Sequence, residues 1–181
     1  MRRISVIGLD GMFLDFLNIL FKLDAMPFLK SSIKDAFVSV LKSTMPPYTP
    51  SAWTSIFSGA NPSKHGLYGF MIRSHKGIRF ANSLDVRYPR IWEMLAMLKI
   101  KNIAINIPLT YPKDGMYLNR SNIFISGWDA PKVETYPSKL FDGSFRNNFI
   151  YPFDWWASKF GSIRKYLKIL NVSLKRRIRY I

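Results

Sequence analysis

The chain has 181 residues, an apolar fraction of 48% and no cysteine. This length suffices for one domain with a sizeable core, and the lack of cysteine excludes disulfides, thiolate metal sites and a cysteine nucleophile. The formal net charge is +16, which favours association with anions. The sequence shows no signal peptide and no apolar run long enough to span a membrane, so we expect a soluble, cytoplasmic protein.

The N-terminal region predicts a buried strand that ends in a carboxylate. Residues 2–9 form a short, β-branched apolar run, R-R-I-S-V-I-G-L, and Asp10 and Gly11 follow it directly. In open α/β sheets, ligands bind outside the carboxyl ends of the strands. Asp10 is therefore a candidate binding residue, although an aspartate after a strand also serves as a turn residue.

The next elements alternate between helix and strand. Apolar spacing predicts a largely buried helix over residues 12–22 and a short helix from Pro27 to residue 34. The run A-F-V-S-V-L over residues 36–41 predicts a second strand, and prolines then hold the following loop extended. This loop leads directly into the stretch around Thr49.

Thr49 is the first candidate for chemistry. Pro50 suits the first position of a helix and Gly59 the position after its end, so the sequence predicts a helix over residues 50–58 with Thr49 as its N-cap. The unpaired N–H groups and positive dipole of a helix start favour phosphate and a developing alkoxide. A threonine there is also an ordinary cap. The spacing of three apolar residues predicts the buried helix face: Trp53, Ile56 and Phe57.

The later sequence continues the alternation. Residues 89–98 form an amphipathic pattern typical of a helix, and residues 102–107 and 122–125 are short apolar runs typical of strands. This β-α-β order indicates an α/β fold.

Several motifs in order carry a resemblance to a known family. They are G-L-D-G-M near the start, P-P-Y-T-P-S-A-W-T-S-I-F-S-G-A-N-P-S-K-H-G over residues 46–66, a W-x-x-L helix, N-I-P-L-T-Y-P over residues 106–112 and I-S-G-W-D-A-P over residues 125–131. Together they resemble the type I phosphodiesterase/nucleotide pyrophosphatase family of the alkaline phosphatase superfamily. The resemblance extends to about Tyr136 and implies an alkaline-phosphatase-like sheet flanked by helices.

The resemblance also implies a reaction. Thr49 would be the nucleophile, and Asp10 and Thr49 would be ligands of one of two divalent metal ions, with zinc as the default and manganese or magnesium as alternatives. The substrate would be a small molecule with a phosphodiester or pyrophosphate bond. The residues around Thr49 do not match the sulfatase pattern C/S-x-P-x-R. Phosphoglycerate-mutase-like relatives share the fold and use a serine nucleophile. In this chain, Ser51 is the only serine close enough to Thr49 to take that role.

The sequence departs from the family in its metal ligands. Family members take most of them from a C-terminal half rich in Asp-His patterns, whereas this chain has two histidines and no Asp-His pair. Asp129, Asp142 and Asp154 lack ligand spacing, so we expect structural or solvent-facing roles for them. We therefore interpret residues 1–150 as the N-terminal part of a truncated catalytic domain. A separate C-terminal half is an expected partner. Whether this chain alone has enzymatic activity is left open.

The two histidines are given different interpretations. His65 lies in the turn-rich segment N-P-S-K-H-G and would be either a ligand or proton carrier, or a brace behind the nucleophile helix. We favour the brace. His75 lies in a basic loop and is expected at the surface.

Residues 151–181 form a basic amphipathic segment that is expected to be helical. From residue 155 onward it has no acidic residue. Such a segment can bind a membrane surface or nucleic acid, or it can pack its apolar side on a partner. A non-enzymatic basic binding module, or an inactive fragment, is thus the alternative to a metal-dependent hydrolase.

Overall fold

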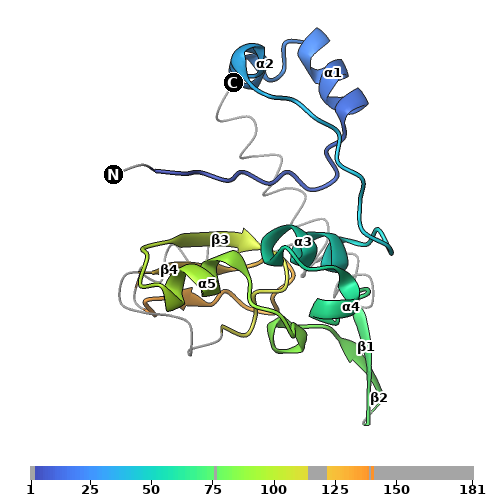
Figure 1. Cartoon of the computed structure of the whole chain (residues 1–181), viewed down its shortest axis with the longest axis vertical. Coiled ribbons are helices and arrows are strands. Elements are labelled where there is room, and N and C mark those ends of the chain that lie inside the picture. Colours follow the sequence, from blue (N-terminus) through green and yellow to red (C-terminus); the bar gives the residue numbers. More distant parts are fainter. Residues whose placement is uncertain (1–2, 76, 114–121, 139, 141–181) are drawn as a thin grey trace, which may run out of the picture. The chain divides into compact units, whose positions relative to one another are not determined.

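The computed structural model describes residues 3–75, 77–113, 122–138 and 140 (Figure 1). The chain divides into two compact units, unit 1 from Met1 to Ser43 and unit 2 from Thr44 to Ile181. The predicted basic segment over residues 151–181, together with Asp142 and Asp154, lies outside the described residues. In the part of the chain that is described, no helix is both long and apolar enough to cross a membrane.

Unit 1 contains the two predicted helices. Helix α1 is Leu14–Lys22, and α2 is Pro27–Ser32, which continues into the 3-10 helix η1, Ile33–Asp35. Pro27 begins α2, as its fixed φ angle and missing N–H predict. In α1 only Phe21 is buried, so the prediction that this helix is largely buried is wrong.

Neither predicted strand of unit 1 is formed. Residues 3–9 and 36–41 belong to no strand, and their side chains are exposed, with Ile4 at 89% and Phe37 at 94%. The sequence pattern detects apolar, β-branched character, but a strand also needs a neighbour to pair its N–H and C=O groups. Within the described residues of unit 1, neither run has such a neighbour.

Unit 2 begins with the predicted nucleophile helix. Helix α3 is Thr49–Ser58, its N-cap is Tyr48, and Gly59 ends it in the left-handed conformation at φ +67°. The C-terminal end is thus confirmed, and the N-terminal end starts one residue earlier than predicted. Thr49 is the first helical residue rather than the N-cap.

The face that α3 buries is not the predicted one. Its buried residues are Pro50, Ser51, Thr54 and Ser58, whereas Ile56 is 65% exposed. Phe57 does pack against the core, and Trp53 stacks on Phe57 with ring centroids 5.8 Å apart. Small polar side chains recur at i, i+3 and i+7 here, so a helix or turn can approach this face closely, an effect that hydrophobicity alone does not reveal.

A short helix and a hairpin follow. Helix α4, Pro62–His65, is capped by Asn61, whose side chain accepts a hydrogen bond from the Lys64 N–H at 3.2 Å. Strands β1, Met71–Ser74, and β2, Gly77–Phe80, then pair antiparallel. This hairpin was not predicted, because its residues are largely exposed and basic and give no alternating apolar pattern. The 3-10 helix η2, Ser83–Asp85, comes next.

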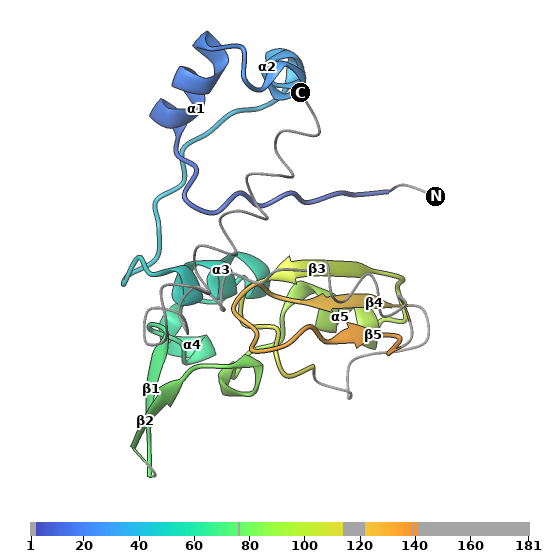
Figure 2. The same cartoon turned by 180° about the vertical axis from the view of Figure 1, so that it is seen from behind.

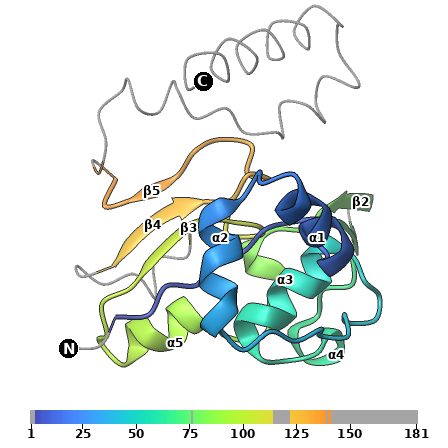
Figure 3. The same ribbon diagram turned by 90° about the horizontal axis from the view of Figure 1, so that it is seen from above.

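The second sheet has the order β3-β4-β5 (Figure 2). Strand β3 is Ile103–Ile107 and β4 is Ile123–Ser126, close to the predicted bounds, and the two pair in parallel. Strand β5, Thr135–Tyr136, pairs antiparallel with β4 and was not predicted. Figure 3 shows the same three strands from another direction. The fold class, a mixed α/β architecture compatible with an alkaline-phosphatase-like fold, is confirmed.

The core of unit 2 lies between helices and this sheet. Helix α5, Ile91–Met97, contributes Trp92, which packs with Ala104 of β3 and Phe124 of β4. Phe57 of α3 joins from the side, with its ring centroid 5.3 Å from that of Trp92. Thus the helix that starts at Thr49 is anchored to the sheet through an aromatic contact.

A buried ion pair fixes the start of α5. Arg90 and Glu93, each 5% exposed, form a salt bridge, and the Arg90 N–H donates to Glu93 Oε2 at 2.6 Å. Arg90 Nη1 also donates to the Leu109 carbonyl oxygen at 2.7 Å. This network ties α5 to the loop that follows β3, and a buried charge needs such complete pairing.

The loops after β3 and β4 are in close contact. A Cβ atom built on Gly127 would lie 2.0 Å from the Ile107 carbonyl oxygen and 2.6 Å from Asp129 Oδ1, so only glycine fits. Asp129 Oδ2 accepts a hydrogen bond from the Leu109 N–H at 2.8 Å. Burial raises the pKa of Asp129 despite this bond. The S-G-W-D-A-P motif therefore holds two loops together, the structural role expected for Asp129.

We predict that Gly127→Ala destabilises the chain by about 3 kcal/mol or more, since the new methyl group would overlap backbone that cannot move freely. Gly59→Ala is the control: its Cβ would have no atom within 4 Å, and only its left-handed backbone adds a cost of about 1 kcal/mol. Urea unfolding followed by circular dichroism measures both. Equal losses would contradict the close approach at Gly127.

Candidate active site around Thr49

Thr49 stands at the N-terminal end of α3 with its side chain partly exposed. Its hydroxyl forms no hydrogen bond with any of the residues that the structure describes. The first helical hydrogen bond runs from the Ala52 N–H to the Tyr48 carbonyl oxygen, 2.9 Å. The Thr49 N–H precedes that bond and has no hydrogen-bond partner among the described residues, whereas Pro50 has no N–H and Ser51 is fully buried. The helix start therefore presents one free donor beside the hydroxyl.

Ser51, the alternative nucleophile, is placed quite differently. Its side chain is fully buried, and Oγ lies 2.6 Å from the Pro46 carbonyl oxygen and 3.0 Å from that of Tyr48. The hydroxyl therefore donates to the loop that precedes α3 and holds that loop against the helix. A serine so enclosed has no access to a substrate, which favours Thr49 over Ser51 as the nucleophile.

Asp10 follows the unpaired run of unit 1, in a turn with Gly11 at φ +70°. It belongs to unit 1 and Thr49 to unit 2. Their pairing as metal ligands stays a prediction.

His65 is completely buried at the end of α4 and connects three segments. Its Nε2 lies 2.9 Å from Ser55 Oγ on α3, and its Nδ1 accepts from the Leu67 N–H at 3.2 Å. Its carbonyl oxygen accepts from the Arg87 N–H at 2.9 Å. Sequence reasoning named His65 but not Ser55, whose only signal is its position on the same helix, six residues after Thr49.

These contacts define the protonation state of His65. Because Nδ1 accepts a backbone N–H, the proton of the neutral ring is on Nε2, which donates to Ser55 Oγ. Burial lowers the pKa of His65 below its ordinary value of 6.5, and a hydrogen bond with the Ser51 backbone opposes that shift in part. A neutral imidazole with both nitrogens occupied acts as a brace for α3.

Most of the sequence matches a single protein family. The model of the family described as type I phosphodiesterase / nucleotide pyrophosphatase matches residues 5–174. The chain therefore belongs to this family. Comparisons with curated proteins and with solved structures gave no match.

Family membership raises the question of metal ions, since the family is generally metal-dependent. Among residues 3–75, 77–113, 122–138 and 140, no group of three or more His, Cys, Asp or Glu side chains could hold a metal ion. Both ring nitrogens of His65 are occupied, by Ser55 and by Leu67. Asp129 Oδ2 accepts from the Leu109 N–H, and its buried Oδ1 has no hydrogen-bond partner among the described residues. The described residues thus do not form a two-metal site by themselves.

We predict that the free energy of unfolding decreases as the pH falls below about 6.5. The unfolded chain then binds a proton at residue 65 that the folded chain, with its lowered pKa, does not bind, and the slope reaches at most about 1.4 kcal/mol per pH unit. His65→Gln removes this contribution.

His75→Gln is the matched control, because His75 is the only other histidine and is exposed. Urea unfolding at pH values from 5 to 8 gives the dependence for each variant. If the His75 variant loses the dependence while the His65 variant keeps it, the buried, neutral state of His65 is contradicted.

Proposed function

We propose that the chain carries the nucleophile of a hydrolase that cleaves phosphodiester or pyrophosphate bonds in small molecules, with Thr49 as that nucleophile. The single observation that carries this assignment is the position of Thr49: its partly exposed hydroxyl stands at the start of α3 without a partner among the described residues. Family membership supports the substrate class.

The chemistry proceeds in two displacements. Thr49 Oγ attacks phosphorus, the bond from phosphorus to the leaving oxygen breaks, and the hydroxyl proton is lost as the leaving oxygen gains one. Water then attacks the phosphorylated threonine and releases the second product. The additional negative charge on the phosphoryl oxygens is stabilised by the Thr49 N–H and by the dipole of the α3 start.

The rigid support of α3 serves this chemistry. Ser51 fixes the preceding loop, His65 holds the middle of the helix through Ser55, and Phe57 anchors its end to the core. A nucleophile positioned in this way loses little orientational freedom when the substrate binds. We propose His65 as a positioning residue on these grounds.

The metal ligands are the part of the proposal that rests on the resemblance alone. We propose Asp10 and Thr49 as ligands of a divalent ion, with zinc, manganese and magnesium to be compared. Such an ion, when bound, would stabilise charge on the attacking oxygen.

The test is the hydrolysis of bis-p-nitrophenyl phosphate by the whole chain in the presence of each metal ion. We expect Thr49→Ala to lose activity by a factor of about a thousand or more, since the nucleophile is removed. Thr49→Ser should retain measurable activity, because it keeps a hydroxyl at the same position.

Ser51→Ala is the discriminating control. It removes the alternative nucleophile and the hydroxyl proton shared between the Pro46 and Tyr48 carbonyl oxygens. Because this loosens the loop before α3, turnover should fall but remain measurable, with some loss of stability. A Thr49→Ala variant as active as the unaltered chain, or a Ser51→Ala variant that is inactive although folded, would reject Thr49 as the nucleophile.

A further inference from the structure

The β1–β2 hairpin projects from the body of unit 2 (Figures 1 and 2). It is a sheet of its own, since among the described residues neither strand pairs with a third one. A two-stranded hairpin alone in water is only marginally stable. Nothing in the chemistry assigned to Thr49 uses this hairpin.

The strand register sorts the side chains of the hairpin into two faces. Ile72 lies directly opposite Arg79, and Arg79 forms a salt bridge with Asp85 of η2 at 2.6 Å. The face that carries Ile72 and Arg79 is therefore turned toward η2. Because successive side chains of a strand alternate between faces, the residues next to these two lie on the other side, which we call the outer face.

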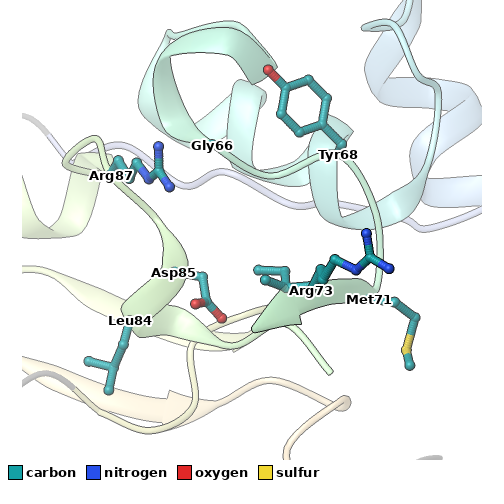
Figure 4. A pocket seen from close by; sticks show the side chains of 8 residues that line it. Gly66, Tyr68, Met71, Arg73, Leu84, Asp85 and Arg87 are labelled. Carbon is teal, nitrogen blue, oxygen red and sulfur yellow. The ribbon is translucent and has the colours of Figure 1, made fainter. Parts of the chain in front are cut away.

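The outer face carries three large apolar side chains and one cation. Met71 lies opposite Phe80, and Arg73 lies opposite Ile78. Ile78 is 70% exposed, Met71 52% and Phe80 49%. Figure 4, which views the pocket of about 440 Å³ beside the hairpin, shows Met71 and the Arg73 guanidinium directed away from Arg87. The solvent face of an antiparallel sheet is normally polar, so this apolar face is a candidate interaction surface.

The hairpin region is also positively charged. Residues 66–84 include Arg73, Lys76 and Arg79 and no acidic residue. Arg79 is neutralised by Asp85, and its guanidinium holds the pKa of that carboxyl below its usual value. Arg73 is exposed and takes part in none of the salt bridges between described residues. The outer face thus offers a cation without a counter-ion among exposed apolar side chains.

The size and charge of the outer face select among possible occupants. A stable protein interface buries about 800 Å² on each partner, more than four side chains of a hairpin supply. A second copy of the chain would bring like charges together, since each copy has a net charge of +16. Nucleic acid is held mainly by cations on its phosphates, whereas this face is mostly apolar. An anionic lipid surface takes up apolar side chains and attracts a cation beside them.

We propose that the outer face of the β1–β2 hairpin binds the surface of an anionic lipid membrane. Met71, Ile78 and Phe80 enter the boundary between headgroups and acyl chains. Arg73 lies among the anionic headgroups, because its long aliphatic stem keeps the charge in water while the neighbouring side chains insert. The proposal goes beyond the reaction at Thr49 and does not depend on it.

The first test locates the contact. The whole chain is mixed with vesicles of phosphatidylcholine that contain about one quarter phosphatidylglycerol, and with vesicles of phosphatidylcholine alone. Since the chain has no cysteine, Ile78→Cys gives a single site for an NBD fluorophore. We expect its emission to rise and shift to the blue with the anionic vesicles, as the label leaves water. Ile103→Cys is the matched control, because Ile103 is 64% exposed on strand β3 of the other sheet, and its label should stay in water.

The second test measures affinity by cosedimentation with the anionic vesicles. Ile78→Ser should weaken binding about tenfold, the effect of losing one inserted apolar side chain, and Arg73→Gln about fivefold. Ile103→Ser and Lys101→Gln remove an apolar group and a charge at exposed positions outside the hairpin and should leave the affinity unchanged. Thr49→Ala should also leave it unchanged, which separates failure here from failure of the proposed reaction.

The proposal is overturned if the chain does not cosediment with the anionic vesicles, or if Ile78→Ser binds as well as the unaltered chain or no worse than Ile103→Ser. A chain that cosediments while the label at position 78 stays in water would place the membrane contact on another surface and would overturn it too. So would a shifted label with single-stranded DNA but not with vesicles, which would assign the face to nucleic acid. Circular dichroism spectra confirm that each variant is folded.

Discussion

The buried imidazole of His65 is the contact on which unit 2 depends most. It joins the turn after α4 to Ser55 on α3, to the Leu67 N–H and, through its carbonyl oxygen, to the Arg87 N–H. The neutral ring satisfies Ser55 Oγ and the Leu67 N–H without burying a charge, and burial itself favours that neutral form. The helix that presents Thr49 and the segment that contains Arg87 are thereby held by the side chain and the backbone of one residue.

The same region shows how the proposed nucleophile, Thr49, is held on a helix without a large apolar face. Helix α3 packs through Ser51, Thr54 and Ser58. The hydroxyl groups of Ser51 and Ser58 pair with nearby backbone and that of Ser55 pairs with His65, so these polar atoms are satisfied in the close packing. Phe57 supplies the apolar anchor through Trp92. The result is a rigid helix whose first residue stays accessible, which is the arrangement that nucleophilic attack requires.

Local signals predicted part of this molecule well. Proline and glycine at its two ends located α3, and apolar runs located β3 and β4, because these features depend on backbone preferences and on neighbours close in sequence. The buried face of α3 and the hairpin were missed, since small polar contacts and exposed strands leave no hydrophobic pattern. Residues 3–9 and 36–41 have the composition of strands, yet pairing depends on a neighbour that composition cannot reveal. The roles of Ser55 and Arg87 could not be predicted either, because both residues act through hydrogen bonds to His65 that only the folded chain brings together.

The covalent bond between Thr49 and phosphorus is the part of the proposed chemistry that can be observed directly. The measurement is mass spectrometry of peptides from chain that has been incubated with a phosphodiester and a divalent ion and then quenched in acid. We expect added phosphoryl mass on the peptide that contains Thr49, located to that residue by fragmentation and absent from Thr49→Ala. Substrate turnover with the label on Ser51, or with no residue labelled, would contradict the account.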